Sequence, residues 1–227
     1  MKGAIGEGDQ ETKEKSMKIL HIDASARTEG SYSRRLSSHF IDCLHENGLA
    51  ITVDRLDLAV HALRHFGALE TAAITLPEAE HSAEMRQAIA PSDALVARVL
   101  AADGIVIGTP IYNFGMPSTL KAFFDHVSRN GKTFLADGTG MRGLLGDTRV
   151  AVLSATGGTY GPGDVFDGLD CLTPHIRAIL GFLGVTDLSF VAAQSMMFAG
   201  PDAAAMSLDA AKTEAASLAK TWSTAWN

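Results

Sequence analysis

The sequence predicts an α/β fold in which five parallel strands form a doubly wound sheet between two layers of helices, three layers in all. Short runs rich in Ile, Val or Leu alternate with longer stretches of helical period along the chain, which is the pattern of such a sheet. No linker, repeat or composition shift interrupts this pattern after residue 17, and 46% hydrophobic residues can fill one core. Residues 17–227 are therefore predicted to form a single domain.

Each predicted strand is short and rich in aliphatic residues, as strands that are buried on both faces usually are. The five strands are expected at residues 17–23, 50–57, 104–109, 148–155 and 187–194. Right-handed crossovers between parallel strands then place helices on both faces of the sheet.

Helical periodicity accounts for the segments between the strands. The first helix is expected at residues 33–47, where apolar residues share one face and Gly48 ends the pattern. Residues 77–101 are predicted to form two helices broken near Pro91, because proline removes a donor and clashes with the preceding turn. Three more helices are expected, one beginning at Pro117, one over residues 168–183 and one after Pro201.

The first sixteen residues, MKGAIGEGDQETKEKS, are predicted to be a disordered tail. They are polar and aperiodic, and they contain no apolar stretch typical of a secretory signal. Met17 stands immediately before the first predicted strand. The segment before it is therefore consistent either with an alternative start at Met17 or with an added extension.

Composition favours a small molecule as the partner. The formal net charge is −7 and the Lys and Arg residues are scattered, whereas nucleic-acid binding needs a clustered basic face. The longest apolar runs are too short and interrupted to cross a bilayer. Cys43 and Cys171 have no CxxC partner and stand among apolar neighbours, as buried thiols in a reduced compartment do. A cytoplasmic protein is expected.

Two absences favour the flavodoxin-like strand order 2-1-3-4-5 over a Rossmann fold. No G-x-G-x-x-G follows the first strand, and no G-x-x-x-x-G-K-[ST] occurs anywhere. In such a sheet a ligand binds beyond the carboxyl ends of the strands, near the switch point between strands 1 and 3. The loops at that edge are therefore the first places to seek a site.

The loop after the first strand, ASARTEGSYSRR, suits a phosphate monoester. It places Ser25, Thr28, Ser31 and Ser33 beside the N-terminus of the first helix, where free N–H groups and the helix dipole favour an anion. Simple capping of the helix by Ser31 or Ser33 would explain the same residues.

Two further loops supply an apolar wall and a stretch of bare backbone. The loop after the third strand carries Ile111, Tyr112, Phe114 and Met116, where connecting segments are normally polar. The loop after the fourth strand contains the pair Gly157 and Gly158, which lets backbone approach a flat ligand or make a turn. Taken together, the three loops suit flavin mononucleotide (FMN), whose ring performs its own redox chemistry.

Two segments resemble the FMN-dependent NADH-azoreductases, which are also two-electron quinone reductases. GTPIYNFGMPSTLKAFFDHVSRNGKTF is similar to that family's P-x-Y-N-F-x-x-P/S-x-x-L-K motif and the T-F after it, and TPHIRAILGFLGVTD resembles the segment before its last strand. The resemblance covers about residues 17–215. It implies a homodimer with one tightly bound FMN per subunit. It also implies a ping-pong reaction in which NADH provides the electrons and quinones or aromatic azo compounds accept them.

The resemblance also implies where the cofactor lies in this sequence. The phosphate would be held by Ser25 and by the turn Ser31, Tyr32 and Ser33, and the ring would lie along Pro110, Ile111, Tyr112, Asn113 and Phe114. The pyrimidine edge would face Gly157 and Gly158, with Ala155 and Thr156 also binding the cofactor, and the substrate pocket would include Phe134, Tyr160 and Asn113. No residue is assigned as catalytic, because the chemistry takes place on FMN.

Four positions depart from the family pattern and leave the acceptor preference open. Ala155 and Thr156 stand where relatives often have Ser-Arg, Tyr160 where one has His, and Ile179 where some have an aromatic residue. The apolar run at residues 194–201, QSMMFAGP, would be exposed in one subunit alone, which also favours a homodimer.

Two other functions and two other sites are each compatible with part of the sequence. A flavodoxin-like electron carrier would share the fold and the cofactor. An acyl-carrier-protein phosphodiesterase-type hydrolase would need a nucleophile or a set of metal ligands, and the sequence shows neither. His61 and His65 have metal-ligand spacing but no third ligand or H-E-x-x-H frame. Asp125 and His126 are adjacent on a predicted helix and so point in different directions. No metal site is predicted.

Overall fold

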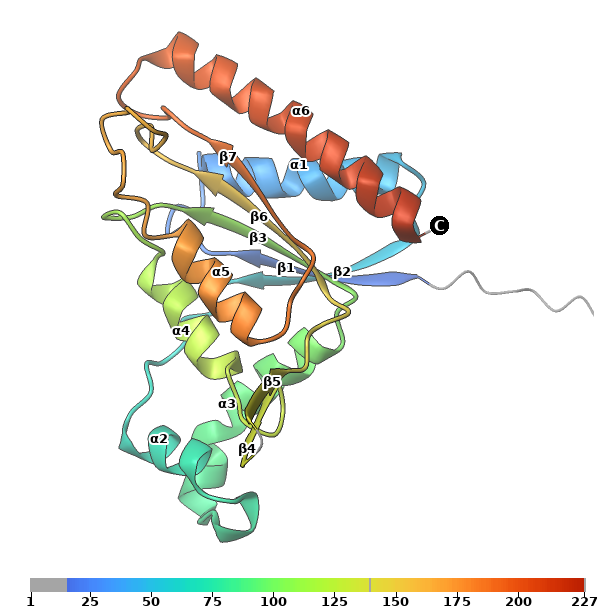
Figure 1. Ribbon diagram of the computed structural model, residues 1–227, viewed down its shortest axis with the longest axis vertical. Coiled ribbons are helices and arrows are strands. Elements are labelled where there is room, and N and C mark those ends of the chain that lie inside the picture. Colours follow the sequence, from blue (N-terminus) through green and yellow to red (C-terminus); the bar gives the residue numbers. More distant parts are fainter. Residues whose placement is uncertain (1–15, 139, 227) are drawn as a thin grey trace, which may run out of the picture.

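The computed structural model describes residues 16–138 and 140–226, with a five-stranded parallel sheet at its centre (Figure 1). The strands are β1 Met17–Asp23, β2 Ile51–Asp57, β3 Gly104–Pro110, β6 Arg149–Ala155 and β7 Leu188–Ala193. Their order, β2-β1-β3-β6-β7, is the predicted 2-1-3-4-5, since a separate hairpin supplies β4 and β5. Because all five run parallel, their carboxyl ends meet at one edge. Except for Ser16, the tail predicted at residues 1–16 lies outside the described residues.

Helices flank the sheet on both faces (Figure 1). On one face α1 (Tyr32–Glu46) and α6 (Pro201–Trp226) enclose a core in which the rings of Phe40 and Trp222 meet edge to face, 5.1 Å between centroids. The other face is covered by α3 Ala83–Leu100, α4 Ser118–Val127 and α5 Thr173–Phe182. Removal of these two apolar cores from water is the main source of the fold's stability.

Pro91 does not break the helix that contains it. α3 runs without interruption through Pro91, so the prediction of two helices over residues 77–101 is wrong. Pro91 is exposed, while its neighbours Ile89 and Ser92 are buried. Ser92 Oγ donates to the carbonyl of His126 at 2.5 Å, which ties this turn to α4. Tertiary packing thus offsets the hydrogen bond that proline removes.

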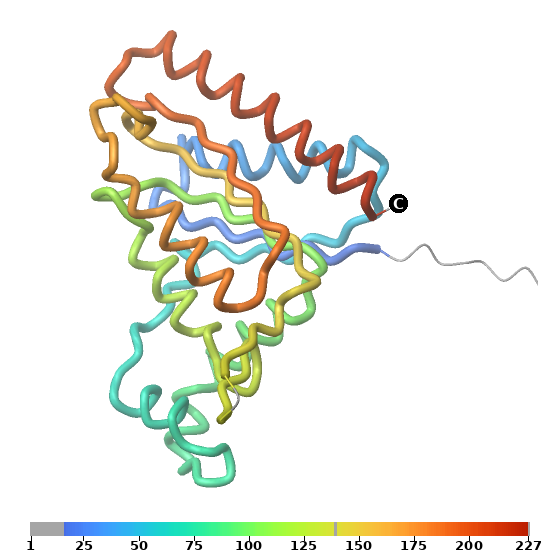
Figure 2. The backbone as a smooth tube through the Cα atoms, viewed as in Figure 1, coloured from blue at the N-terminus to red at the C-terminus, as the bar shows by residue number. Residues whose placement is uncertain are grey.

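Two parts of the fold carry no clear sequence signal. They are α2 Ala68–Thr75 with the 3₁₀ turn Glu78–Glu80, and the antiparallel hairpin of β4 Phe134–Asp137 and β5 Gly140–Gly143. The α2 segment extends away from the sheet at the bottom of the view in Figure 2. The hairpin contacts the end of α5, where a β-carbon on Gly143 would lie 2.0 Å from the carbonyl carbon of Leu183.

The two cysteines have different environments. Cys43 is buried as predicted, but Cys171 is exposed, so that prediction is wrong. The reason is that α5 begins only at Thr173, not at residue 168. Cys171 therefore lies in the loop before the helix, where its N–H donates to the carbonyl of Phe114 at 2.9 Å. None of the helices in residues 16–138 and 140–226 combines the length and apolar character that a bilayer crossing requires.

Candidate functional site

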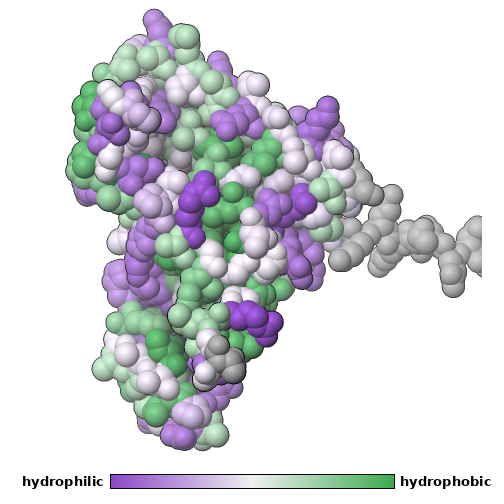
Figure 3. Space-filling model, in the orientation of Figure 1, coloured by the Kyte–Doolittle hydropathy of each residue, from purple (hydrophilic) through white to green (hydrophobic). Residues whose placement is uncertain are grey.

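The loops that follow β1, β3, β6 and β7 enclose a hollow of about 530 Å³, here called the edge hollow. Its size is typical of cofactor and small-molecule sites. The structure brings together here every residue predicted to bind the cofactor, namely Ser25, Ser31, Tyr32, Ser33, Pro110, Ile111, Tyr112, Asn113, Phe114, Ala155, Thr156, Gly157 and Gly158. In Figure 3, apolar surface gathers at the left edge of the upper part, where Figure 1 shows the loops after β6 and β7.

Three buried serines form the polar end of the edge hollow. Ser31 caps α1 by accepting the N–H of Arg34 at 3.5 Å, and the hydroxyls of Ser31 and Ser33 are 3.3 Å apart. Ser25 Oγ lies 3.5 Å from the hydroxyl of Tyr112. These contacts are long for hydroxyl hydrogen bonds, usually about 2.7–2.8 Å, so a stronger acceptor would compete well for the donors. The first N–H groups of a helix lack intrahelical partners, so this end suits a phosphate.

A strained turn presents an aromatic ring at the middle of the hollow. Tyr112 and Gly115 exchange backbone hydrogen bonds of 2.9 and 3.0 Å. Between them Asn113 and Phe114 have φ angles of 48° and 71°, a region that glycine and asparagine tolerate better than phenylalanine does. Phe114 is 43% exposed, so burial in this chain does not account for its strained backbone. Such strain is typical of functional sites.

Gly157 and Gly158 supply accessible backbone at the far end of the hollow. The carbonyl of Gly157 accepts two backbone N–H groups, and that of Gly158 accepts the Thr156 hydroxyl at 2.7 Å. Among the described residues, the N–H groups of both glycines have no hydrogen-bond acceptor. A β-carbon on Gly158 would lie 2.4 Å from the ring of Phe166. Only glycine leaves this backbone free to approach a ligand without displacing that ring.

The structure adds residues to the hollow that sequence reasoning missed: Arg27, Phe166, Met196, Met197 and Phe198. The ring of Phe166 lies 5.3 Å from that of Tyr160 and 5.9 Å from that of Phe114. Burial raises the pKa of Tyr160. The apolar run at residues 194–201 could have indicated that Met196, Met197 and Phe198 line the hollow, whereas no sequence motif indicates Phe166.

Phe134 lies apart from the other predicted pocket residues. It is the first residue of β4, its ring centroid is 4.7 Å from that of Phe182, and it does not line the edge hollow of this chain. The unpredicted hairpin determines this position. Tyr160 and Asn113 do line the hollow, and Ile179 packs against the core from α5.

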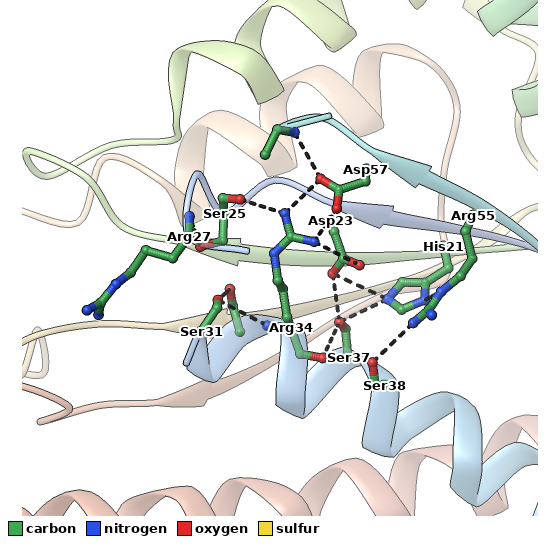
Figure 4. A network of polar contacts seen from close by, with 12 residues as sticks. His21, Asp23, Ser25, Arg27, Ser31, Arg34, Ser37, Ser38, Arg55 and Asp57 are labelled. Carbon is green, nitrogen blue, oxygen red and sulfur yellow. Dashed lines mark hydrogen bonds and ion pairs between the residues drawn. The ribbon is translucent and has the colours of Figure 1, made fainter. Parts of the chain in front are cut away.

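Behind the serines, polar side chains from β1, β2 and α1 form a network (Figure 4). Arg34 donates from Nη1 and Nη2 to the two carboxylate oxygens of Asp57 at 2.5 and 2.7 Å. Nη2 also donates to the carbonyl of Ser25 at 2.7 Å. The Arg34 guanidinium holds the pKa of Asp57 below its ordinary value. This bidentate pair fixes the start of the serine-bearing loop to β2.

His21 and Asp23 are buried members of this network (Figure 4). Arg55 Nε donates to His21 Nδ1 at 3.4 Å, so Nε2 carries the proton and donates to Ser37 Oγ at 2.9 Å. Ser37 Oγ in turn donates to Asp23 Oδ1 at 3.3 Å. Burial, aided by the charges of Arg55 and Arg34, lowers the pKa of His21 to about 4. With a pKa of about 4, the histidine is neutral at pH 7. Burial also raises the pKa of Asp23.

Comparison with known proteins gives consistent matches. Residues 17–219 match the model of the Flavodoxin_2 family, described as a flavodoxin-like fold. An FMN-dependent NADH:quinone oxidoreductase of a Nostoc species is 40% identical over 205 residues, which cover 90% of this chain and 99% of the relative. FMN-dependent NADH:quinone oxidoreductase 1 of a Jannaschia species is 43% identical over 188 residues, covering 82% and 92%. The crystal structure of an azoreductase from Bacillus anthracis str. Sterne has a TM-score of 0.83 and 28% identity, covering 90% of this chain and 99% of that one.

Proposed function

The chain belongs to the Flavodoxin_2 family of flavodoxin-like proteins, and we propose that it is an FMN-dependent oxidoreductase that uses NADH to reduce quinones by two electrons. One observation carries the proposal: hydroxyls at a helix N-terminus, an apolar turn and bare glycine backbone meet in one hollow of about 530 Å³. The Nostoc relative, 40% identical over 90% of this chain, is named for the same activity. The match over residues 17–219 is consistent with the proposal of one flavodoxin-like domain over residues 17–227.

The residues present fit FMN. Ser25, Ser31 and Ser33 would hold the phosphate, because they are buried and their hydroxyl–hydroxyl contacts are long, 3.3–3.5 Å. The turn from Tyr112 to Gly115 would cover the isoalloxazine ring, and the N–H groups of the glycine pair would face its pyrimidine edge. Bound FMN supplies two-electron redox chemistry, while the protein orients the reactants and excludes water.

We propose further that NADH and the acceptor occupy the edge hollow in turn, in a ping-pong reaction, and that the acceptors include aromatic azo compounds. The rings of Phe114, Tyr160 and Phe166 lie close together there and would stack on flat aromatic molecules of either kind. Steady-state rates at several quinone concentrations test this order. Parallel double-reciprocal lines support it, whereas intersecting lines would mean that both substrates bind together.

A homodimer is also proposed. Met197 and Phe198 are each 68% exposed and Val165 is 86% exposed, beside the glycine pair. Exposed apolar clusters of this kind are typical of subunit interfaces. Phe198→Asp should shift the protein toward monomer in sedimentation experiments, while Val60→Asp, at a 66% exposed position after β2, should not. A wild-type protein that is fully active as a monomer would contradict the proposal.

A spectrum of the purified protein, or of the protein mixed with FMN and freed of excess, tests the central proposal. A bound flavin absorbance that one equivalent of NADH bleaches anaerobically, in a single transition, is expected. Quinone added afterwards should restore the absorbance. A bound flavin that NADH does not reduce would indicate an electron carrier instead. Absence of any FMN binding would refute the proposed function.

A further inference from the structure

We propose that Arg34 is a positioning residue that closes the serine loop, defined here as residues 25–31, around the phosphate of FMN; this inference rests on the proposed function. Ser25 and Ser31 at the two ends of the loop are buried, whereas residues 26–30 between them are exposed. An exposed segment of this length has little packing of its own. Its geometry must therefore be set where it is anchored.

Arg34 contacts both anchors of the serine loop (Figure 4). Its backbone N–H donates to Ser31 Oγ at 3.5 Å, and its Nη2 donates to the carbonyl of Ser25 at 2.7 Å. One residue thus joins the end of the loop to its beginning. The separation between the hydroxyl of Ser25 and those of Ser31 and Ser33 depends on this closure.

The guanidinium is itself held in place by β2. Asp57 accepts from both terminal nitrogens of Arg34 at 2.5 and 2.7 Å, and it also accepts the N–H of Ala59 at 2.9 Å. The side chains of Arg34 and Asp57 are only 14% and 27% exposed. A planar guanidinium can make the two parallel bonds to Asp57 and still reach the Ser25 carbonyl, whereas the single ammonium of a lysine cannot reproduce this geometry.

Loss of the contact between Arg34 and the Ser25 carbonyl would weaken binding of the FMN phosphate more than binding of the ring. Without Arg34, phosphate binding would have to order the serine loop, and that ordering opposes affinity. Riboflavin has the same ring and ribityl chain but no phosphate, so its binding depends little on the loop. Arg34 therefore sets how strongly the protein prefers FMN to riboflavin. A residue that only supported the fold would affect both ligands alike.

The chain offers a matched control on the same strand. Arg98 of α3 donates from Nε and Nη2 to the carboxylate of Asp54, each at 2.8 Å, and from Nη2 to the carbonyl of Arg55 at 2.8 Å. This contact pattern repeats that of Arg34, two bonds to an aspartate of β2 and one to a backbone carbonyl. It connects α3 to β2 and does not touch the serine loop.

The test measures the dissociation constants of FMN and riboflavin, by quenching of flavin fluorescence, for apoprotein of the wild type, Arg34→Met, Arg34→Lys and Arg98→Met. Arg34→Met should raise the dissociation constant of FMN about tenfold or more and change that of riboflavin far less. Arg34→Lys should lose less of the preference for FMN, and Arg98→Met should retain it. If Arg34→Met does not fold, the ratio of the riboflavin and FMN dissociation constants for Arg34→Lys, compared with that of the wild type, tests the proposal.

An unchanged FMN constant, or equal losses for FMN and riboflavin, would overturn the role of Arg34. In either case FMN binding by the wild type leaves the proposed function intact. A wild type that binds neither flavin would instead refute the proposed function.

Discussion

Replacement of His21 by glutamine should remove a defined acid sensitivity from the fold. The side chain of His21 has no exposed surface, and burial together with Arg55 and Arg34 lowers its pKa from 6.5 to about 4. As the pH falls, the unfolded chain takes up a proton near pH 6.5, whereas the folded chain does not until about pH 4. The stability contributed by neutral His21 is therefore present above pH 6.5 and is lost as the pH falls toward 4.

The size of the effect follows from this shift of the pKa. At ~1.36 kcal/mol per pKa unit, the complete loss is about 3 kcal/mol, and about 2 kcal/mol of it falls between pH 7 and pH 5. Asp23 acts in the opposite direction, because burial raises its pKa and its protonation favours the folded state. Asp57, whose pKa is lowered by Arg34, loses its contribution only in more acidic solution. Both aspartates remain in the variant, so the comparison isolates His21.

Urea unfolding of the wild type and His21→Gln at pH 7 and pH 5 provides the assay. Glutamine has an acceptor for Arg55 and a donor for Ser37 but no proton to gain in this range. The free energy of unfolding should fall by about 2 kcal/mol more in the wild type than in the variant. His45→Gln, at an exposed position of α1, controls for the substitution itself. Parallel losses in the wild type and His21→Gln would show that His21 does not remain neutral in the folded protein.

Three further outcomes are expected. Phe114→Gly should weaken FMN binding without lowering the free energy of unfolding, because glycine relieves a left-handed backbone that costs other residues about 1 kcal/mol; a clear loss of stability would argue against strain at this turn. Gly143→Ala should lower the free energy of unfolding in urea by about 2 kcal/mol or more, because its β-carbon would lie 2.0 Å from the carbonyl carbon of Leu183. Gly138→Ala, in the same hairpin, has open space around the added β-carbon and should change the free energy of unfolding little. Gly158→Asp should lower the two-electron midpoint potential at saturating FMN by roughly 20–60 mV, from about 1–3 kcal/mol of charge repulsion. An unchanged or raised potential would mean that the ring does not lie along this backbone.

Much of the candidate site, the edge hollow, could be predicted because its residues stand next to elements with strong patterns. Ser25, Ile111 and Gly157 each lie one or two residues beyond the end of a short apolar strand. Once parallel pairing is inferred, the carboxyl ends of those strands must share one edge, and the loops behind them meet without further information. The strand order follows from the same alternation of strands and helices, since right-handed crossovers leave few alternatives.

Other features were decided by contacts between segments far apart in the sequence. Pro91 remains within α3 because Ser92 is bonded to the carbonyl of His126, and no local rule reveals that partner. Phe134 lies against Phe182 because an unpredicted hairpin places it there. Phe166 joins the edge hollow from a loop that carries no motif.

The sequence by itself thus determined the class of fold, the sheet order and the residues at the strand ends, because these depend on periodicity and chain direction. The tertiary structure decided which polar groups are buried together. Arg34 and Asp57 are 23 residues apart, and His21 and Arg55 are 34 apart, yet they share one network behind the serine loop. Their protonation and their hold on the loop arise from mutual burial, which is a property of the folded chain and not of any local pattern.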